Sequence, residues 1–197
     1  MNLKEKLIKL EAENGGKVVI PRDNGNQGRM IGNDRMAADA HDYAGFYAKH
    51  LKNKSFKTVM EIGILAGTGL SMWSKLYPDA RIYGCDIRHD LIQVELPTNV
   101  SLHIVDQTTV RATDIKNIIS SKKLDLVIDD AMHEPKPLEN TFIAIEPFLS
   151  KDFLYILEDL NAKSMGTPYN PTKSKLFSKY AIDYDAERGI AAITRKL

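Results

Sequence analysis

Cysteine is nearly absent from this sequence of 197 residues, in which Cys85 stands alone. A single thiol excludes an internal disulfide and a cysteine-based zinc cluster, and its place in a predicted strand indicates a small core residue. Long apolar runs are also absent. Lysine and glutamate interrupt the leucines of residues 1–16, and no run of about 18 apolar residues occurs anywhere. We therefore expect a cytoplasmic protein with no membrane partner.

An excess of charge of one sign is missing too. Lysine and arginine number 27, aspartate and glutamate 26, and the net charge is +1. Proteins that bind nucleic acid usually carry a strongly basic face or domain, so nucleic acid is not an expected partner. Repeats and low-complexity tracts are absent as well. With 43% hydrophobic residues, the chain is expected to form one domain over residues 1–197 with a sizeable core.

The feature around which the sequence is organised is the stretch 58–90. It predicts a buried strand at 58–62, a glycine turn, a helix and a second strand at 81–86. Gly63 and Gly67 lie in the turn, where the backbone can pass close to a ligand because no Cβ is in the way. The pattern is typical of one half of a nucleotide-binding α/β sheet.

Two acidic residues flank this turn. Asp86 ends the second strand nineteen residues after Gly67, where an acceptor for ribose hydroxyls belongs. Glu61 produces the spacing E-x-G-x-x-x-G, which differs from the G-x-G-x-x-G that holds a pyrophosphate at a helix N-terminus. A carboxylate there would repel a diphosphate but can serve a cationic ligand with an amino-acid end. A dinucleotide oxidoreductase is therefore disfavoured.

These residues resemble motif I of the class I S-adenosylmethionine (SAM) methyltransferases. The resemblance implies that SAM is the cofactor of the protein. It assigns the methionine pocket to Glu61, Gly63 and Gly67 and the ribose contact to Asp86.

The rest of the chain continues the alternation of strands and helices. Further strands are expected at 101–107, 124–130 and 153–159, helices at 35–52, 91–96, 114–120 and 137–149, and a closing antiparallel hairpin at 179–184 and 190–194. Strands that alternate with helices form a parallel sheet with right-handed crossovers. The expected fold class is α/β, a Rossmann-like, mostly parallel seven-stranded sheet with a C-terminal antiparallel hairpin and helices on both faces. In SAM enzymes the residues after the third strand often contact adenine, which implicates Asp106 and Gln107.

Two segments outside this alternation are candidates for the acceptor side. Residues 1–34 predict a short helix over 2–14 and then a stretch rich in glycine and asparagine at 22–34, either a surface loop or a cover over the active site. Residues 161–178 are expected to form a mobile loop with one helical turn. Because both segments are short, a partner chain could complete them, and a homo-oligomer is expected.

Acidic pairs end two neighbouring strands of the expected sheet, Asp129-Asp130 and Glu158-Asp159. Ligands of an open α/β sheet bind beyond the carboxyl ends of its strands, so Asp130, Glu158 and Asp159 should converge beside the SAM pocket. Crowded carboxylates repel one another unless a proton or a cation bridges them, and oxygen ligands favour Mg²⁺, Mn²⁺ or Ca²⁺. Alternatively, these acids cap the following segments or end their strands in solvent. Asp129 points to the opposite face, where it would support the SAM site or the metal ligands.

A histidine follows the first acidic pair. His133 lies three residues after Asp130, and histidine is the side chain whose ordinary pKa is closest to neutral pH. A divalent cation orients a substrate hydroxyl and lowers its pKa, and a nearby base then removes the proton. His133 is the candidate for that base.

Four segments of the sequence carry a more specific resemblance. D-D-A-M-H at 129–133 and Y-I-L-E-D at 155–159 look like the corresponding segments of the macrocin and mycinamicin sugar O-methyltransferases, a metal-dependent family. Gly32-Asn33-Asp34-Arg35 resembles the G-T-D-K segment of that family, and His41-Asp42-Tyr43 with Tyr47 resembles its H-x-Y-x-x-x-Y segment.

This resemblance implies a set of roles at the second site. Asp130, Glu158 and Asp159 would be the ligands of Mg²⁺ or Mn²⁺, and His133 the general base. The catechol-type O-methyltransferases share a similar metal geometry, but they have lysine at the position of His133 and asparagine at that of Asp159, so the sugar branch fits better. The expected activity is SAM- and metal-dependent methylation of a hydroxyl on a sugar or a sugar-bearing small molecule.

Other functions remain open at this point. A metal-independent methyltransferase acting on nucleic acid or protein is one alternative, although the fourth strand lacks the N/D-P-P-Y/F motif that grips an exocyclic amine. The other is an accessory protein that binds SAM without turnover, which would show no effect of Mg²⁺ on binding.

Overall fold

The computed structural model describes residues 1–15, 19–21, 29–31, 34–161 and 168–196. Side chains are described for all of these except residues 14, 15, 19–21 and 29–31. The expected cover at 22–34 therefore lies largely outside the described residues. Among the helices that are described, none has both the length and the apolar character that crossing a membrane requires.

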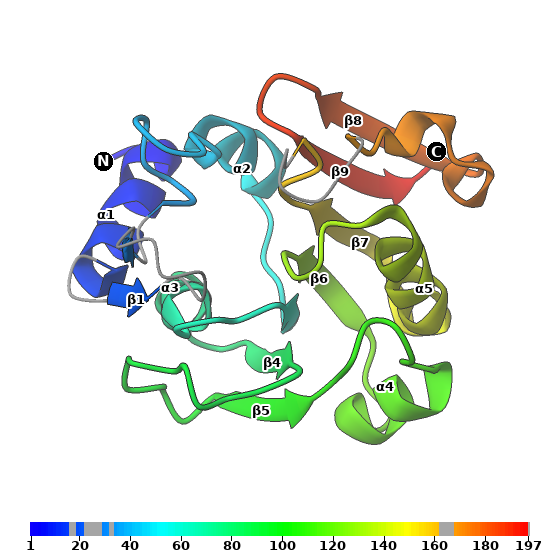
Figure 1. Cartoon of the computed structure of the whole chain (residues 1–197), viewed down its shortest axis with the longest axis horizontal. Helices are drawn as coiled ribbons and strands as arrows, with labels where there is room; N and C mark the ends of the chain where they lie inside the picture. The colour runs from blue at the N-terminus through cyan, green and yellow to red at the C-terminus, as the bar shows by residue number, and fades with distance from the viewer. Residues whose placement is uncertain (16–18, 22–28, 32–33, 162–167, 197) are drawn as a thin grey trace.

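A seven-stranded sheet with the order β5-β4-β3-β6-β7-β9-β8 runs through the molecule (Figure 1). Its strands are β3 (Thr58–Ile62), β4 (Arg81–Asp86), β5 (Val100–Ile104), β6 (Leu124–Asp129), β7 (Leu149–Leu157), β8 (Tyr180–Asp185) and β9 (Ile190–Arg195). Pairing is parallel from β5 to β7, and β9 pairs antiparallel with both β7 and β8. The expected Rossmann-like sheet with its closing antiparallel hairpin is confirmed.

Helices cover both faces of this sheet, as Figure 1 shows. On one face lie α1 (Leu3–Gly15), α2 (Ala44–Leu51) and α3 (Thr68–Leu76); on the other lie α4 (Ala112–Ile119) and α5 (Pro135–Ile145). Three single-turn 3₁₀ helices are also described, η1 (Glu146–Phe148), η3 (Pro171–Lys173) and η4 (Lys175–Phe177). The last two occupy the described part of the segment expected to hold one helical turn.

The burial of β3 explains why residues 58–62 form a continuous apolar run in the sequence. All five residues of β3 are buried, and successive side chains of a strand point to opposite faces. Val59 belongs to the same buried apolar cluster as Tyr47 and Trp73, on the side of α1, α2 and α3. Met60 belongs to the cluster that contains Phe142, on the side of α4 and α5. Two apolar layers thus hold the strand from both sides.

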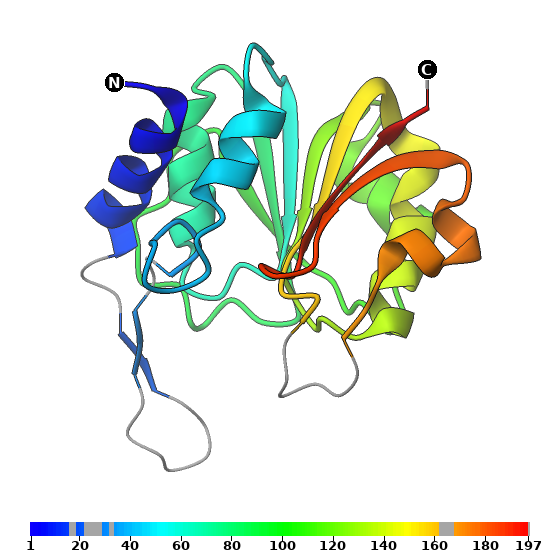
Figure 2. The ribbon, with the colours of Figure 1, turned by 90° about the horizontal axis from the view of Figure 1, so that it is seen from above.

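The carboxyl ends of β3, β6 and β7 meet at one edge because these strands are parallel (Figure 2). Just beyond each strand, a backbone hydrogen bond joins the chain to the neighbouring strand. The Gly63 N–H donates to the Cys85 carbonyl at 2.8 Å, and the Asp130 N–H to that of Ile62 at 2.8 Å. The Glu158 N–H donates to the carbonyl of Asp129 at 3.0 Å. These backbone bonds bring the glycine turn and both acidic pairs to the same edge.

The prediction of a helix over 35–52 is wrong for its first half. Residues 34–43 form turns in which the Tyr43 N–H donates to the Arg35 carbonyl at 3.0 Å. Asp42 has a positive φ of 53°, a left-handed conformation that an α-helix cannot contain. The helix therefore begins only at Ala44.

The helix expected over 91–96 is absent from this part of the described chain. The Gln93 N–H donates to the Ala66 carbonyl at 3.1 Å, so the segment bonds to the glycine turn instead of to itself. Its apolar side chains pack against Gly67. A tertiary contact has replaced the local helix.

Several other boundaries differ from the expected ones. The strand expected over 101–107 ends at Ile104, and the strand expected to begin at 153 begins at Leu149. At the N-terminal side, β1 (Val19–Pro21) pairs antiparallel with β2 (Arg29–Ile31), although 29–31 was expected to be part of a loop. These shifts leave the polar strand ends in place.

Candidate active site

The glycine turn packs against the loop that follows β6. Gly63 has a φ of 84°, and a Cβ added there would overlap the carbonyl of Asp130. Gly67 has a φ of 81° and immediately precedes α3. Both positions need glycine for backbone reasons, and at Gly63 the crowding partner is the Asp130 backbone. The turn therefore holds the acidic loop in place.

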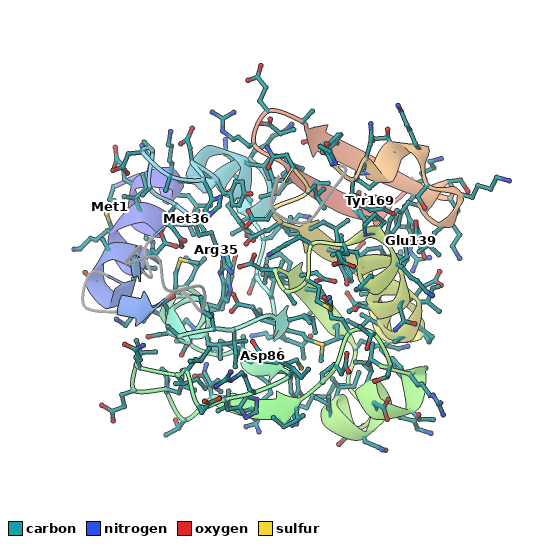
Figure 3. All side chains as sticks on the ribbon, in the orientation of Figure 1. Met1, Arg35, Met36, Asp86, Glu139 and Tyr169 are labelled. Carbon is teal, nitrogen blue, oxygen red and sulfur yellow. The ribbon has the colours of Figure 1, made fainter. Side chains whose placement is uncertain are left out.

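Asp86 lies at the end of β4 and faces the same turn (Figure 3). Its Oδ2 accepts the backbone N–H groups of Ile64 at 2.8 Å and Leu65 at 3.3 Å. Two apolar side chains beside it are exposed, Leu65 at 40% and Ile87 at 63%. A hydrogen-bond acceptor next to exposed apolar side chains suits a nucleoside, which has ribose hydroxyls and a flat base.

A cavity of about 380 Å³ connects Asp86 with the acidic strand ends. This volume falls within the usual range of roughly 300–1,000 Å³ for small-molecule sites. Its lining residues are Asp34, Arg35, His41, Tyr43, Gly63, Leu65, Asp86, Ile87, Asp130, Ala131, Met132, His133, Glu158 and Asp159. The two chemical signals found in the sequence thus share one cavity.

Arg35 stands at the centre of the acidic strand ends, on the side of α3 (Figure 3). It is 8% exposed. Its Nη2 lies 2.7 Å from Oε1 of Glu61 and 2.6 Å from Oδ2 of Asp130, and its Nε donates to Oε2 of Glu158 at 2.8 Å. Burial disfavours the charged guanidinium, but the Glu158, Glu61 and Asp130 carboxylates outweigh it and raise the pKa of Arg35. The guanidinium of Arg35 therefore joins acidic residues at the ends of β3, β6 and β7.

The two buried glutamates differ from the aspartates in their surroundings. Glu61 and Glu158 are each 1% exposed. Burial raises the pKa of both, and the nearby Arg35 opposes that effect without cancelling it. Each glutamate is therefore a costly charge that depends on the guanidinium.

Two tyrosines hold the second acidic pair. The Tyr43 hydroxyl donates to Oδ1 of Asp159 at 2.6 Å, and the Tyr47 hydroxyl donates to Oε1 of Glu158. Tyr43 immediately precedes α2, and its carbonyl accepts the Tyr47 N–H at 2.9 Å. The two hydroxyls are therefore one turn apart and reach two adjacent acids at a strand end. The sequence alone indicated no role for Tyr43, Tyr47 or Arg35. The available signal was the resemblance of Arg35, Tyr43 and Tyr47 to the G-T-D-K and H-x-Y-x-x-x-Y segments.

Asp130, His133 and Asp159 form a group that can hold a cation. One ligand atom from each lies within 4.8 Å of the others. His133 Nε2 is 3.9 Å from Oδ1 of Asp130 and 3.9 Å from Oδ2 of Asp159. Both His133 and Asp159 have positive φ values, 57° and 52°, which are uncommon for residues other than glycine, although asparagine, aspartate and histidine adopt them more often than most.

His41 lies on the other side of Asp159. Its Nδ1 is 3.2 Å from Oδ1 of Asp159, and its ring stacks on Tyr43. Asp34 raises the pKa of His41, against the opposing effect of burial. A second histidine thus borders the cavity, and its part in the family-like segment was the only sign of it in the sequence.

The residues expected near adenine lie in different places. Asp106 is half-buried, and its Oδ1 accepts the Thr108 N–H at 2.8 Å. Gln107 is buried, donates from Nε2 to Oδ1 of Asp129 at 2.6 Å and accepts the Met132 N–H at 2.9 Å. Burial raises the pKa of Asp129 to about 7. Gln107 and Asp129 therefore support the 130–133 loop from behind, and no cavity contact of either is described.

Comparison with known proteins gives one relative by sequence. The chain is 28% identical over 130 residues to the 8-demethyl-8-alpha-L-rhamnosyl tetracenomycin-C 2'-O-methyltransferase of Streptomyces olivaceus, covering 61% of this chain and 33% of that protein. No family model matches.

Solved structures share the fold over most of the chain. MycE, a methyltransferase from the mycinamycin biosynthetic pathway solved with Mg and S-adenosylhomocysteine (SAH), matches with a TM-score of 0.61 and 20% identity over 78% of this chain and 49% of its own. CmcI matches with a TM-score of 0.59 and 20% identity over 90% of this chain and 82% of its own. The fold is that of a class I methyltransferase. The expected resemblance to the sugar O-methyltransferases is confirmed.

This methyltransferase fold implies a SAM site and, in the metal-dependent branch, a cation site. The residues present fit both. Asp130 and Asp159 each direct one oxygen toward His133, a hard donor set that suits Mg²⁺. For the cofactor, the same cavity extends to Asp86 and the glycine turn. The chain spans about a third of the length of the curated relative and about half of MycE.

Proposed function

We propose that this chain is a SAM- and divalent-metal-dependent O-methyltransferase that acts on a hydroxyl of a sugar or a sugar-bearing small molecule. The observation that carries the proposal is the single cavity that runs from Asp86 and Gly63 to Asp130, His133 and Asp159. A methyl donor and an acceptor hydroxyl must meet for an in-line displacement, and this cavity brings both groups of residues together.

The relatives support the acceptor class. The Streptomyces olivaceus relative is named for methylation of the 2'-oxygen of a rhamnosyl group, and MycE has been solved with Mg, SAH and mycinamycin VI. Fold alone does not specify an acceptor, so the sugar is proposed from the sequence relative together with the aspartate and histidine donors of the site. Cytoplasmic location, a single domain and a homo-oligomer stay predictions.

On the cofactor side, Asp86 is proposed to accept hydrogen bonds from the ribose. Glu61, Gly63 and Gly67 would shape the methionine pocket, with Glu61 held by Arg35. Asp106, Gln107 and Asp129 were assigned to the cofactor from the sequence. For Gln107 and Asp129 we propose support of the loop, while the assignment of Asp106 to adenine stays a prediction.

On the acceptor side, SAM supplies the methyl group, and a bound divalent cation lowers the pKa of a hydroxyl that it contacts. Asp130 and Asp159 would hold that cation, and His133 Nε2 lies within reach of both carboxylates to accept the hydroxyl proton. Tyr43 and Arg35 fix the other oxygen of each aspartate. Glu158, the third acid assigned by resemblance, lies beside them.

The test is isothermal titration of the protein with SAH, with and without Mg²⁺, on the wild type and on Asp130→Ala. We expect SAH to bind and Mg²⁺ to give a separate heat that the variant loses. Transfer from radiolabelled SAM to a panel of glycosides then tests the acceptor class.

Each other outcome favours a different function. Binding of SAH without any heat from Mg²⁺ would reject metal dependence and favour a metal-independent methyltransferase acting on nucleic acid or protein. Binding of both ligands without transfer to any acceptor would favour an accessory SAM-binding protein.

A further inference from the structure

The turn between β8 and β9 is tied to the residue that precedes Tyr43. The turn lies beside α2 (Figure 1) and carries Arg188, whose Nη2 donates to Oδ2 of Asp42 at 2.7 Å. Nε of Arg188 donates to the backbone carbonyl of Asp42 at 3.1 Å, and Nη1 donates to Oδ2 of Asp185 at 3.0 Å. The guanidinium therefore binds both the side chain and the backbone of Asp42, while Asp185 holds the guanidinium in the turn.

Asp42 lies between two residues that line the cavity, His41 and Tyr43. Its φ of 53° is left-handed, a conformation that costs free energy in residues other than glycine and persists where contacts hold it. The Asp42 N–H donates to the carbonyl of Ala37 at 3.0 Å, and Arg188 holds the side chain and the carbonyl. The conformation of Asp42 sets the directions in which the two neighbouring side chains point.

The same turn also holds the chain after the second acidic pair. The Leu160 N–H donates to the carbonyl of Gly189 at 2.7 Å, and Nδ2 of Asn161 donates to the carbonyl of Glu187 at 3.0 Å. Gly189 has a φ of 70°, and a Cβ added there would overlap Asn161. Because Leu160 directly follows Asp159 in the chain, the turn fixes the backbone next to that acid.

The two segments that the turn holds meet at Asp159. The Tyr43 hydroxyl donates to Oδ1 of Asp159 at 2.6 Å, and Nδ1 of His41 lies 3.2 Å from the same oxygen. The Asp159 N–H donates to the Tyr43 hydroxyl oxygen at 3.2 Å. These contacts close a ring that runs from the β8–β9 turn through Asp42 and Tyr43 to Asp159 and back to the turn. Each member of the ring is therefore restrained from two sides.

We propose that Arg188 is a positioning residue of the active site: by holding Asp42, it fixes the direction of Asp159 at the acceptor end of the cavity. His41 and Tyr43, the neighbours of Asp42, transmit this effect through their contacts with Asp159. Arg188 is not among the described residues that line the cavity, so it acts through these contacts and not on a ligand. This inference rests on the proposed function, in which Asp159 holds the divalent cation.

The exposure and the charge of Arg188 distinguish a positioning role from a structural one. The side chains of Arg188 and Asp42 are 39% and 29% exposed, and exposed ion pairs contribute little to stability, so folding does not depend on this pair. A positive charge also repels a nearby cation. Loss of that charge would by itself tighten cation binding, whereas loss of a positioning residue weakens it.

The test measures Mn²⁺ binding by the loss of the free-ion EPR signal, in the presence of saturating SAH. We expect Arg188→Gln to weaken binding by about 3- to 10-fold. Lys49→Gln is the matched control, because Lys49 Nζ lies 2.6 Å from Oδ2 of Asp183 and also joins α2 to the hairpin, while neither residue lines the cavity. That control should leave the Mn²⁺ affinity within about 2-fold of the wild type. Unchanged or tighter binding in Arg188→Gln, or equal weakening in both variants, would overturn the positioning role.

A double-mutant comparison tests the path through Asp42. Asp42→Gly removes the carboxylate, and glycine adopts the left-handed backbone without strain. If Arg188 acts through Asp42, the loss of Mn²⁺ affinity in the double variant should be smaller than the product of the two single losses. Losses that multiply would show independent effects and overturn this path. Arg188→Lys keeps the charge without the fork of donors, so its Mn²⁺ affinity should lie between those of the wild type and Arg188→Gln.

Further controls separate this inference from general damage and from the proposed function. Arg188→Gln should keep its SAH affinity within about 2-fold of the wild type and an unchanged midpoint of urea unfolding. Loss of SAH binding together with Mn²⁺ binding would indicate general damage and overturn the positioning role. Absence of Mn²⁺ binding to the wild type would reject the metal-dependent function and this inference with it, whereas the wrong order among the variants would reject the inference alone.

Discussion

Oε2 of Glu11 in α1 accepts the backbone N–H of Met36 at 2.7 Å, and both residues are buried. The N-terminal helix is thereby tied to the residue that follows Arg35 in the chain. Burial raises the pKa of Glu11 from its ordinary 4.5 to about 7. Folding disfavours the charged form of Glu11, and this carboxyl group supports the segment that carries the Arg35 guanidinium.

The first prediction concerns the pH dependence of stability. Because the folded pKa of Glu11 lies above the unfolded one, its contribution to stability is full below about pH 4.5 and is lost as pH rises through about 7. Glu11→Gln keeps an acceptor for the Met36 N–H and cannot ionise. At pH 8 we expect the variant to be more stable than the wild type by about 1–3 kcal/mol, measured by urea unfolding.

The same helix offers a control for this prediction. Glu13 has a side chain that is 44% exposed, and exposed ion pairs contribute little to stability, so Glu13→Gln should change the free energy of unfolding at pH 8 by less than Glu11→Gln does. Asp129, whose pKa burial also raises to about 7, should maintain part of the slope in Glu11→Gln. A variant with the full wild-type slope would contradict the assignment to Glu11.

The second prediction concerns Gly63. An alanine there must adopt a φ of 84° and place its Cβ against the Asp130 carbonyl. We expect Gly63→Ala to reduce the free energy of unfolding by about 3 kcal/mol or more, measured by chemical denaturation. Gly45→Ala is the matched control, because a Cβ at this position in α2 meets only Lys4 Nζ, at 4.0 Å. That control should stabilise the protein by about 0.5–1 kcal/mol, and equal losses in both variants would contradict the steric argument.

The third prediction concerns cofactor binding. Asp86 lines the cavity and accepts two N–H groups of the glycine turn. Hydrogen bonds to charged groups contribute about 1.5–3 kcal/mol, so Asp86→Asn should weaken SAH binding by about 10- to 100-fold in a calorimetric titration. Asp90→Asn is the control, since Asp90 is exposed and pairs with Arg88. Wild-type affinity in Asp86→Asn would remove Asp86 from the cofactor site.

The fourth prediction concerns the segment after residue 167. The Tyr169 hydroxyl donates to Oε1 of Glu139 in α5 at 2.7 Å, and the two residues lie next to each other in Figure 3. Tyr169→Phe should therefore reduce the free energy of unfolding by about 1 kcal/mol. Tyr184→Phe, whose hydroxyl makes a longer bond of 3.3 Å, should cost less. The reverse order in thermal or urea unfolding would contradict this role of Tyr169.

Local physical chemistry explains how much of the fold could be predicted from the sequence. A strand buried on both faces reads as an apolar run, as at 58–62, and the positive φ values of Gly63 and Gly67 require the residue type that the sequence supplies. The helix expected over 91–96 failed because its apolar side chains pack on Gly67. Long-range contacts, and not local helix propensity, determined the conformation of that segment.

The acidic strand ends mark the limit of sequence reasoning at the site. The order of strands and helices by itself determined that the carboxylates after β6 and β7 would meet at one edge, because parallel neighbouring strands end together. Only the tertiary structure decided what each carboxylate faces, since Arg35 reaches Glu158 across 123 positions of the chain. Charge pairing over such a separation depends on how α1, α2 and α3 pack on the sheet, and no local pattern encodes that packing.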